Sequence, residues 1–270
     1  MKITKIMDRV FIISDRAGCC SNVIIGDEKG LVFDTCCGIE DTHAAVREIT
    51  DLPLLVINSH GHFDHIGGNS LFDKVYLHQS DMNLFTYHPP EKLGEWMRIM
   101  AGSDGSFAVE PGQFGNTVPL DFDLFDLGNL ECHILPLTGH SFGSVGVYVP
   151  KLKLLLSGDA LTPIMLLVFA NHGTLEEQIG TVNRAMTLDI DGFLTSHHDK
   201  MFPKELFQRM ARCLESVKTA KGYKYQYPKP PYADGTLYLD REAGEPVAVV
   251  VDKSDISAYN PTWSSIYRGY

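Results

Sequence analysis

Short apolar runs separated by polar turns dominate the first third of the chain and predict β-strands. Val10–Ser14, Asn22–Gly26 and Leu31–Asp34 are such runs. The polar segment 26–30 between the last two has the composition of a hairpin turn. Leu54–Asn58 is continuously apolar, which is typical of a strand buried on both faces. This part of the chain is therefore predicted to form a sheet.

Helical and strand-like segments alternate through the remainder of the chain. Helices are predicted over Thr42–Thr50, Thr174–Thr187 and Pro203–Ala220, with Thr174 as the N-cap of the second because acidic residues follow it. Further strands are predicted at Lys74–His78, Leu130–Leu137, Ser144–Val149, Leu154–Leu156 and Gly192–Thr195. This alternation places the chain in a mixed α/β (α+β) class.

Two regions depart from this alternation of strands and helices. Residues 80–118 combine bulky apolar side chains with glycine, and we interpret them as a partly helical insertion followed by a mobile loop. The insertion forms either local core or a lid over a substrate. We expect residues 1–220 to form the catalytic domain.

The segment 221–270 is rich in aromatic residues and is predicted to be an extension packed on that domain. Within it, Tyr223–Asp234 reads as an irregular connection and Thr236–Lys253 as a hairpin that turns at 241–245. As alternatives, the segment 221–270 could cover the active site or form a homodimer interface.

The net charge restricts the partners of this protein. Acidic residues outnumber basic ones, and the formal net charge is −11. Because such a protein repels phosphate backbones, nucleic acid is not an expected partner. The N-terminus lacks the apolar segment of a signal peptide, and no apolar run is long enough to span a membrane. We expect a cytoplasmic protein that acts on a small molecule.

Six cysteines include two adjacent pairs, Cys19-Cys20 and Cys36-Cys37. In a cytoplasmic protein the default is reduced thiols, and no Cys-x-x-Cys spacing indicates a structural zinc site. Because Cys36-Cys37 follows a predicted strand end, a redox role and a place in the lining of a functional site stay open as alternatives.

The segment 60–65, His-Gly-His-Phe-Asp-His, holds four side chains that can bind a metal. In an extended chain His60 and His62 point to the same side, so they can bind one ion together. The chain must turn after Phe63, and Asp64 and His65 can then face a second position. This density of ligands predicts a metal site.

Three later loops supply further candidate ligands, each directly after a predicted strand. His140 lies in the first loop, Asp159 in the second, and His197 and His198 in the third. Adjacent residues of an extended segment face opposite ways, so only one of the two histidines is expected to bind.

These motifs, in this order, resemble those of the metallo-β-lactamase-fold hydrolase superfamily, which includes glyoxalase II-like enzymes. The resemblance runs from Val10 to His198 and implies a four-layer αββα sandwich with a metal centre at one edge. Carried over by position, it assigns His60, His62 and His140 to a first metal, Asp64, His65 and His197 to a second, and Asp159 to a bridge between them. His197 is favoured over His198 because it follows the small residue Ser196. Asp34 and Asn58 are candidates for orienting the imidazoles, and a purely structural role is the alternative for the aspartate.

The resemblance also implies a reaction. Two divalent ions, zinc as the first choice with iron or manganese as alternatives, would activate a bridging hydroxide that cleaves an ester-like bond, with Asp64 orienting the water. Thioesters and lactones are the expected substrates, with β-lactams and phosphodiesters as further alternatives. An iron-dependent redox enzyme similar to persulfide dioxygenases is the other hypothesis. Phe63 stands where the diiron flavoprotein branch places glutamate, which argues against that branch.

Overall fold

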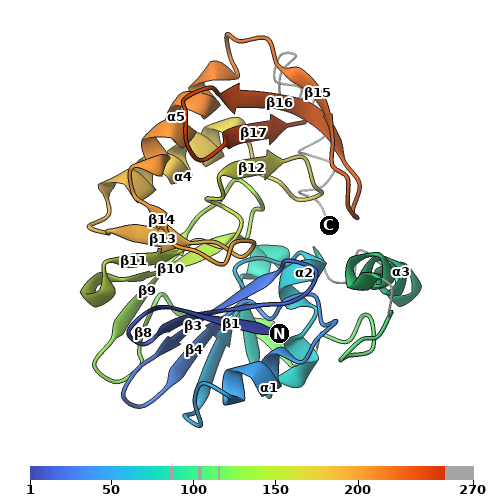
Figure 1. The fold of residues 1–270 in the computed structure, drawn as a ribbon, viewed down its shortest axis with the longest axis vertical. Helices are drawn as coiled ribbons and strands as arrows, with labels where there is room; N and C mark the ends of the chain where they lie inside the picture. Colours follow the sequence, from blue (N-terminus) through green and yellow to red (C-terminus); the bar gives the residue numbers. More distant parts are fainter. Residues whose placement is uncertain (85–87, 103–104, 115, 253–270) are drawn as a thin grey trace.

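Residues 1–84, 88–102, 105–114 and 116–252 are described in a computed structural model, whose two central sheets stack face to face (Figure 1). The first sheet has the strand order β1 (Lys2–Met7), β2 (Val10–Ser14), β3 (Cys20–Ile25), β4 (Gly30–Phe33), β5 (Leu54–Ile57), β6 (Val75–Leu77) and β7 (Thr117–Pro119). The second has the order β14 (Phe202–Pro203), β13 (Gly192–Leu194), β11 (Leu154–Leu156), β10 (Val145–Val149), β9 (Glu131–Pro136) and β8 (Leu124–Asp126).

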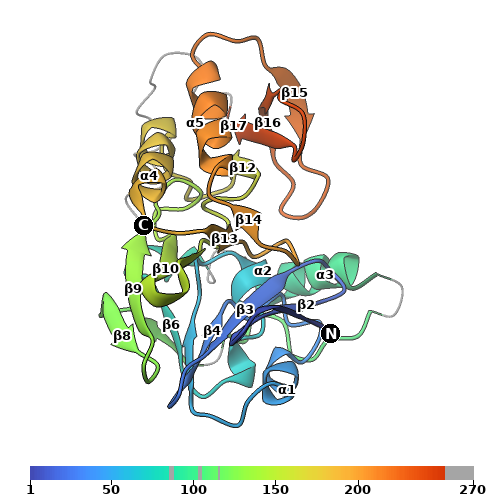
Figure 2. The ribbon, with the colours of Figure 1, turned by 60° about the vertical axis from the view of Figure 1, so that its left-hand side comes forward.

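Helices cover the outer faces of this pair of sheets (Figures 1 and 2). The first sheet is covered on its outer side by α1 (Thr42–Arg47), and α2 (Phe63–Ile66) and α3 (Pro90–Ala101) lie toward one end of it. The second sheet is covered by α4 (Leu175–Thr187) and α5 (Leu206–Ser216). Short 3₁₀ turns occur at Asn69–Leu71, Gln79–Asp81 and Pro150–Leu152. The expected αββα arrangement is confirmed.

Apolar side chains from both central sheets meet in one buried layer. Ile12, Phe33 and Ile57 of the first sheet pack in the same cluster as Val147 and Leu156 of the second. Strands with continuous apolar sequence, such as β4 and β11, are buried along their whole length, as expected for strands covered on both faces. This layer fixes the two sheets relative to each other and therefore fixes the loops at their edges.

A further sheet joins the C-terminal segment to the core. It has the order β12 (Ile164–Leu167), β17 (Val247–Val251), β16 (Asp234–Asp240) and β15 (Tyr223–Gln226), and it packs against α5. The predicted hairpin is confirmed, with Asp240 opposite Val247. The strand β12 pairs in parallel with β17, which lies about eighty residues later in the chain.

Several local predictions can be compared with the structure. Thr174 caps α4 as predicted: its hydroxyl accepts from the Glu177 backbone at 3.1 Å, and the Glu177 carboxylate accepts from the Thr174 backbone at 2.7 Å. The irregular connection predicted at Tyr223–Asp234 is wrong in its first part, because Tyr223–Gln226 pairs with β16. The strands β1, β7, β8, β12 and β14 were not predicted. The helix predicted from Pro203 begins only at Leu206, because Pro203 pairs with Gly192 in the second sheet.

None of the described helices has the combination of length and apolar character that crossing a membrane requires.

Candidate metal centre

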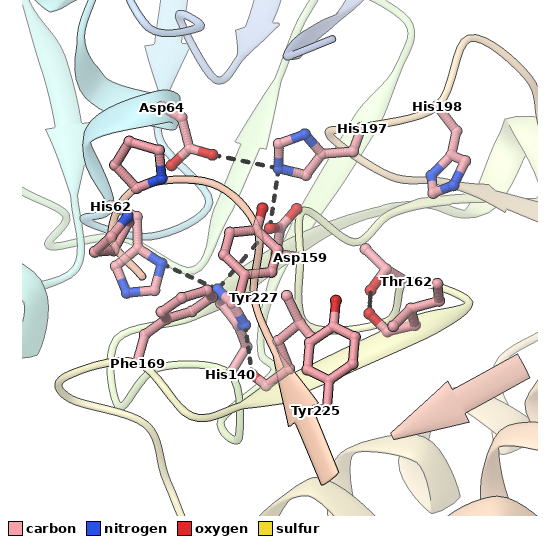
Figure 3. Close-up of a pocket in the computed structure, with 14 residues that line it drawn as sticks. His62, Asp64, His140, Asp159, Thr162, Phe169, His197, His198, Tyr225 and Tyr227 are labelled. Atoms are coloured by element: carbon pink, nitrogen blue, oxygen red, sulfur yellow. Dashed lines mark hydrogen bonds and ion pairs between the residues drawn. The ribbon is translucent and has the colours of Figure 1, made fainter. Parts of the chain in front are cut away.

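The candidate ligands lie in loops that follow strands of the two central sheets. The segment His60–His65 follows β5, and α2 begins at Phe63, which confirms the predicted turn. His140 follows β9, Asp159 follows β11, and His197 follows β13. Because these strands end at the same edge of the sandwich, the loops converge there (Figures 1 and 3). All seven predicted ligand residues are brought together.

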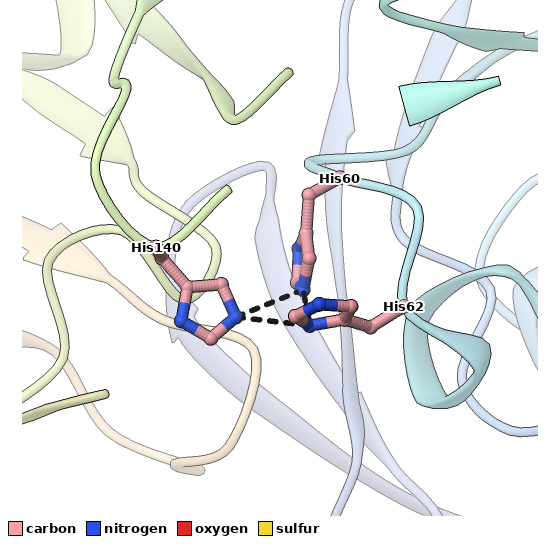
Figure 4. A group of neighbouring side chains, drawn as sticks. All are labelled: His60, His62 and His140. Carbon is pink, nitrogen blue, oxygen red and sulfur yellow. Dashed lines mark hydrogen bonds between the residues drawn. The ribbon is translucent and has the colours of Figure 1, made fainter. Parts of the chain in front are cut away.

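Three imidazoles form the first group (Figure 4). His60 Nε2 lies 2.9 Å from His62 Nδ1, and His140 Nε2 lies 3.2 Å from the former and 3.1 Å from the latter. Burial lowers the pKa of His62 and of His140 to about 4, and it lowers the pKa of His60 in the same direction. Three neutral imidazoles with converging nitrogens are a ligand set suited to a divalent cation.

The second group joins two carboxylates to two imidazoles. His197 Nε2 lies 3.1 Å from Asp159 Oδ2 and 3.5 Å from Asp64 Oδ2. His65 Nε2 lies 3.5 Å from the same Asp159 oxygen and 3.7 Å from Asp64 Oδ2. Asp159 Oδ2 is also 3.9 Å from His140 Nε2 of the first group. Asp159 therefore stands between the two groups.

The electrostatics of the second group differ from those of the first. Burial disfavours a charged His197, but the carboxylates of Asp159 and Asp64 outweigh that effect and raise its pKa to about 9. Burial likewise opposes the charge on His65, and the carboxylates of Asp159, Asp64 and Asp34 raise its pKa well above the usual range. Without a metal, the protons on these imidazoles balance the negative charge of the carboxylates.

Buried polar atoms that lack a hydrogen-bond partner indicate whether these residues fit metal ions. Among the described residues, His65 Nε2 and Asp159 Oδ1 are buried and have no hydrogen-bond partner. A buried polar atom without a partner is costly, and both atoms are of the types that bind divalent metals. Together with the all-nitrogen first group, this donor set fits divalent cations in both positions.

The two adjacent histidines at 197 and 198 face different surroundings. The ring of His197 points toward Asp64 and Asp159, and its Nδ1 is 3.2 Å from the Gly18 carbonyl oxygen. The ring of His198 is turned away from the carboxylates (Figure 3), with its Nδ1 2.9 Å from the Thr195 hydroxyl. His198 still lines the cavity beside the centre.

Asp34 is a fully buried carboxylate behind the second group. Its Oδ2 is 3.0 Å from His65 Nδ1 and accepts hydrogen bonds from the hydroxyls of Ser59 at 2.8 Å and Ser196 at 2.5 Å. The Ser59 hydroxyl is in turn 2.9 Å from His60 Nδ1. Asp34 therefore contacts an imidazole of the second group, as expected of a residue that orients it.

The other orienting candidate, Asn58, contacts the backbone of a ligand rather than its ring. Its amide donates to the His65 carbonyl oxygen at 2.9 Å and its own oxygen accepts from Asn69. Asn58 therefore supports the position of the loop and does not orient an imidazole directly.

Asp81 is a second buried carboxylate, which the sequence did not indicate. It accepts hydrogen bonds from the backbone of Gly61 at 3.0 Å and of Gly143 at 2.8 Å, and from the side chains of Ser141 and Asn171 at 2.6 Å each. Gly61 lies between two ligands of the first group, and Ser141 directly follows the third. Asp81 therefore ties together the loops that carry the first group.

The cysteines are buried and form no disulfide. The Cys37 thiol donates to Asp15 Oδ2 at 3.2 Å, and Cys19 lies beside both residues. The Cys19 sulfur also belongs to a group with Asp64 and His197 whose ligand atoms lie within 4.8 Å of one another. Cys19 is therefore the thiol that borders the second group, whereas the sequence drew attention to Cys36-Cys37.

A cavity of about 190 Å³ opens beside the two groups. His62, Asp64, His140, Asp159 and His197 form one side of it. Tyr225 and Tyr227 of the C-terminal segment also line it (Figure 3), as do Pro230 and Pro231. The ring of Tyr227 packs edge-on against Phe169 at 5.1 Å between centroids. The described part of this segment, residues 221–252, thus both packs on the core and lines the candidate site.

The insertion contributes one helix to this end of the molecule. On α3, Leu93, Trp96 and Met97 are buried in a cluster with Phe63 and Cys37. The same helix lines a second cavity beside His62. Residues 85–87, 103–104 and 115 of the insertion lie outside the described part of the chain, as do the tail residues from 253 onward, including the aromatic side chains at 259–270.

Comparison with known proteins gives consistent results. Residues 16–197 match the family described as the metallo-beta-lactamase superfamily. Acyl-coenzyme A thioesterase MBLAC2 of Bos taurus is 26% identical over 230 residues, which are 74% of this chain and 82% of that protein. The probable metallo-hydrolase YqgX of Bacillus subtilis (strain 168) is 29% identical over 143 residues, 51% of this chain and 64% of that protein.

Solved structures share the fold. DIM-1 metallo-beta-lactamase superposes with a TM-score of 0.55 at 19% identity, covering 80% of this chain and 97% of its own. The sec-alkylsulfatase Pisa1 from Pseudomonas sp. gives a TM-score of 0.61 at 15% identity, and the match covers 80% of this chain and 42% of that longer one. With the family match extending over more than half of the sequence, the chain belongs to the metallo-beta-lactamase superfamily and is a hydrolase of that superfamily.

Proposed function

We propose that this protein is a binuclear metal-dependent hydrolase that cleaves the thioester bond of a small acyl-thiol substrate. The observation that carries the proposal is the pair of ligand groups that meet at Asp159 beside a cavity. His60, His62 and His140 would hold one ion, and Asp64, His65 and His197 the other, with Asp159 shared. Zinc is the metal we propose, because imidazole and carboxylate ligands suit it.

The bound ions would supply an activated water and would polarise the carbonyl group of the substrate. The side chains of the protein would orient the water and limit the access of solvent. Asp64 Oδ2 lies 3.5 Å from His197 Nε2 at the cavity wall, where its carboxylate can orient a water molecule and accept its proton. Tyr225, Tyr227 and Phe169 narrow the cavity and exclude bulk water from it.

The thioester is favoured over the other ester-like bonds by the comparisons. The bovine relative, which matches 74% of this chain, bears the name acyl-coenzyme A thioesterase. The cavities agree with an acyl substrate, because an apolar cavity adjoins the candidate metal site.

A substrate screen with matched metal analysis tests the proposal. The zinc-loaded protein and the EDTA-stripped protein are assayed in parallel against acyl-coenzyme A thioesters, lactones, phosphodiesters and cephalosporins, and bound metal is measured by mass spectrometry. We expect thioester cleavage that is lost with EDTA and restored by zinc, with two ions per chain. Preferential cleavage of another class would refute the thioester assignment, and one iron per chain with oxygen uptake on glutathione persulfide would refute the hydrolase mechanism.

A further inference from the structure

We propose that the second cavity, between α2, α3 and residues 231–233, binds the alkyl chain of the acyl group. This inference rests on the proposed thioester hydrolysis and adds the place where the acyl chain lies. The cavity measures about 480 Å³, more than twice the volume beside the ligand groups. That size falls within the range of about 300–1,000 Å³ that small-molecule pockets occupy.

The two cavities share a wall. His62, Phe169 and Pro231 line both of them. The Phe169 ring packs edge-on against His62 and His140, with centroid distances of 5.6 and 6.1 Å. If the carbonyl group of a substrate lies beside the ligand groups, only these shared lining residues separate it from the larger cavity. Passing beside Phe169 is the short route for a chain attached to the carbonyl carbon.

The lining of the second cavity is suited to a hydrocarbon. Phe63, Ile66, Leu93 and Trp96 line it and are each less than 9% exposed. The rings of Phe63 and Trp96 pack at 5.4 Å between centroids. An alkyl chain that leaves water for these surfaces gains binding free energy with each methylene.

The acidic and the basic side chain that line the cavity are both exposed to solvent. Lys92 and Glu95 line it from exposed positions on α3. Moving the phosphates of coenzyme A into the apolar interior would leave them without partners, which is strongly unfavourable. The charged thiol half of the substrate therefore stays outside, and the uncharged alkyl chain is the part that fits.

The test uses acyl-coenzyme A thioesters from acetyl through butyryl and octanoyl to palmitoyl. We expect kcat/KM to rise by about fourfold per added methylene until the cavity is filled, which is the factor that burying one methylene provides. Ala170→Phe places a ring in the cavity and should lower the octanoyl-to-acetyl ratio by about fifteenfold, the equivalent of about two displaced methylenes.

Two further variants complete the design. Ala211→Phe is the matched control, since Ala211 is also partly buried but lies on α5 away from both cavities, and it should keep the ratio of the wild type. Trp96→Ala enlarges the cavity and should move the optimum toward longer chains. Circular dichroism verifies that each variant is folded. A flat chain-length profile, or equal ratios in Ala170→Phe and Ala211→Phe, would overturn the inference.

Binding measurements separate this inference from the proposed function. S-alkyl coenzyme A thioethers of the same chain lengths are not hydrolysed, and their affinity is measured by calorimetry. Chain-length-dependent affinity that Ala170→Phe weakens supports the cavity even if no thioester is cleaved, an outcome that would refute only the proposed reaction. Thioester cleavage with thioether affinity independent of chain length refutes the cavity and leaves the reaction standing.

Discussion

Removing the Asp81 carboxylate should weaken the first ligand group although Asp81 contacts none of its imidazoles. The side chain is fully buried and accepts four hydrogen bonds. In Asp81→Ala the hydroxyl of Ser141 can turn to Ser144, which lies 2.7 Å away. The backbone N–H groups of Gly61 and Gly143 cannot turn, so both lose their partner.

The magnitude follows from these two donors. Leaving a buried donor unpaired costs about 1–3 kcal/mol, so Asp81→Ala should lower the free energy of unfolding by about 2–6 kcal/mol. The carboxylate is also closely enclosed, because a Cβ atom at Gly143 would lie only 2.5 Å from Asp81 Cγ. Asp81→Asn keeps this shape and retains one acceptor oxygen. It should therefore lose only about half as much stability.

Two measurements check this reasoning. Urea unfolding of the EDTA-treated protein gives the free energy of unfolding, and competition with a chromophoric chelator gives the zinc affinity. We expect the tighter zinc affinity to fall by about 10–100-fold in Asp81→Ala, as for other residues that position metal ligands. Asp189→Ala is the control, because Asp189 forms an exposed ion pair with Lys153. Removal of this ion pair should change the free energy of unfolding by less than about 0.5 kcal/mol. An Asp81→Ala protein with the stability and zinc affinity of that control would refute the reasoning.

Three further predictions concern the ligands themselves. Asp159→Ala should reduce hydrolysis by more than about a hundredfold and lower the bound metal measured by mass spectrometry, and full activity would exclude the shared-ligand arrangement. His197→Ala should leave about one ion per chain by the same measurement, whereas His198→Ala should keep both, and the reverse result would assign the ligand to His198. A metal entering the second group must displace the proton of His197, whose pKa is about 9, and that of His65, whose pKa is also raised, so calorimetric affinity there should fall by at least about tenfold per pH unit below about pH 9. The first group contains His62 and His140, whose pKa values are about 4, so its affinity should change little until the pH approaches about 4, and equal pH slopes would contradict the assignment.

Local sequence determined the parts of this protein that depend on neighbouring residues. Apolar runs predicted the strands β4, β5 and β11. The strands β4 and β11 are buried along their whole length, whereas β5, which was expected to be buried on both faces, is only half-buried at Leu54 and Leu55. Thr174 and Glu177 specified the start of α4 through a capping box confined to four residues. The motif at 60–65 also specified its own turn, and the order of the later loops indicated the candidate ligands.

Tertiary structure decided what depends on residues far apart in the sequence. The strand at Tyr223–Gln226 exists because β16 supplies its hydrogen bonds, and β12 because β17 does. Asp81 looks like an ordinary acidic loop residue until Gly61 and Gly143 converge on it from twenty and sixty-two positions away. The apolar cavity beside His62 likewise combines α2, α3 and residues 231–233, so only folding creates its shape. The sequence alone determined the chemistry of the ligands, and the packing of the sheets decided which carboxylates position them and what space adjoins them.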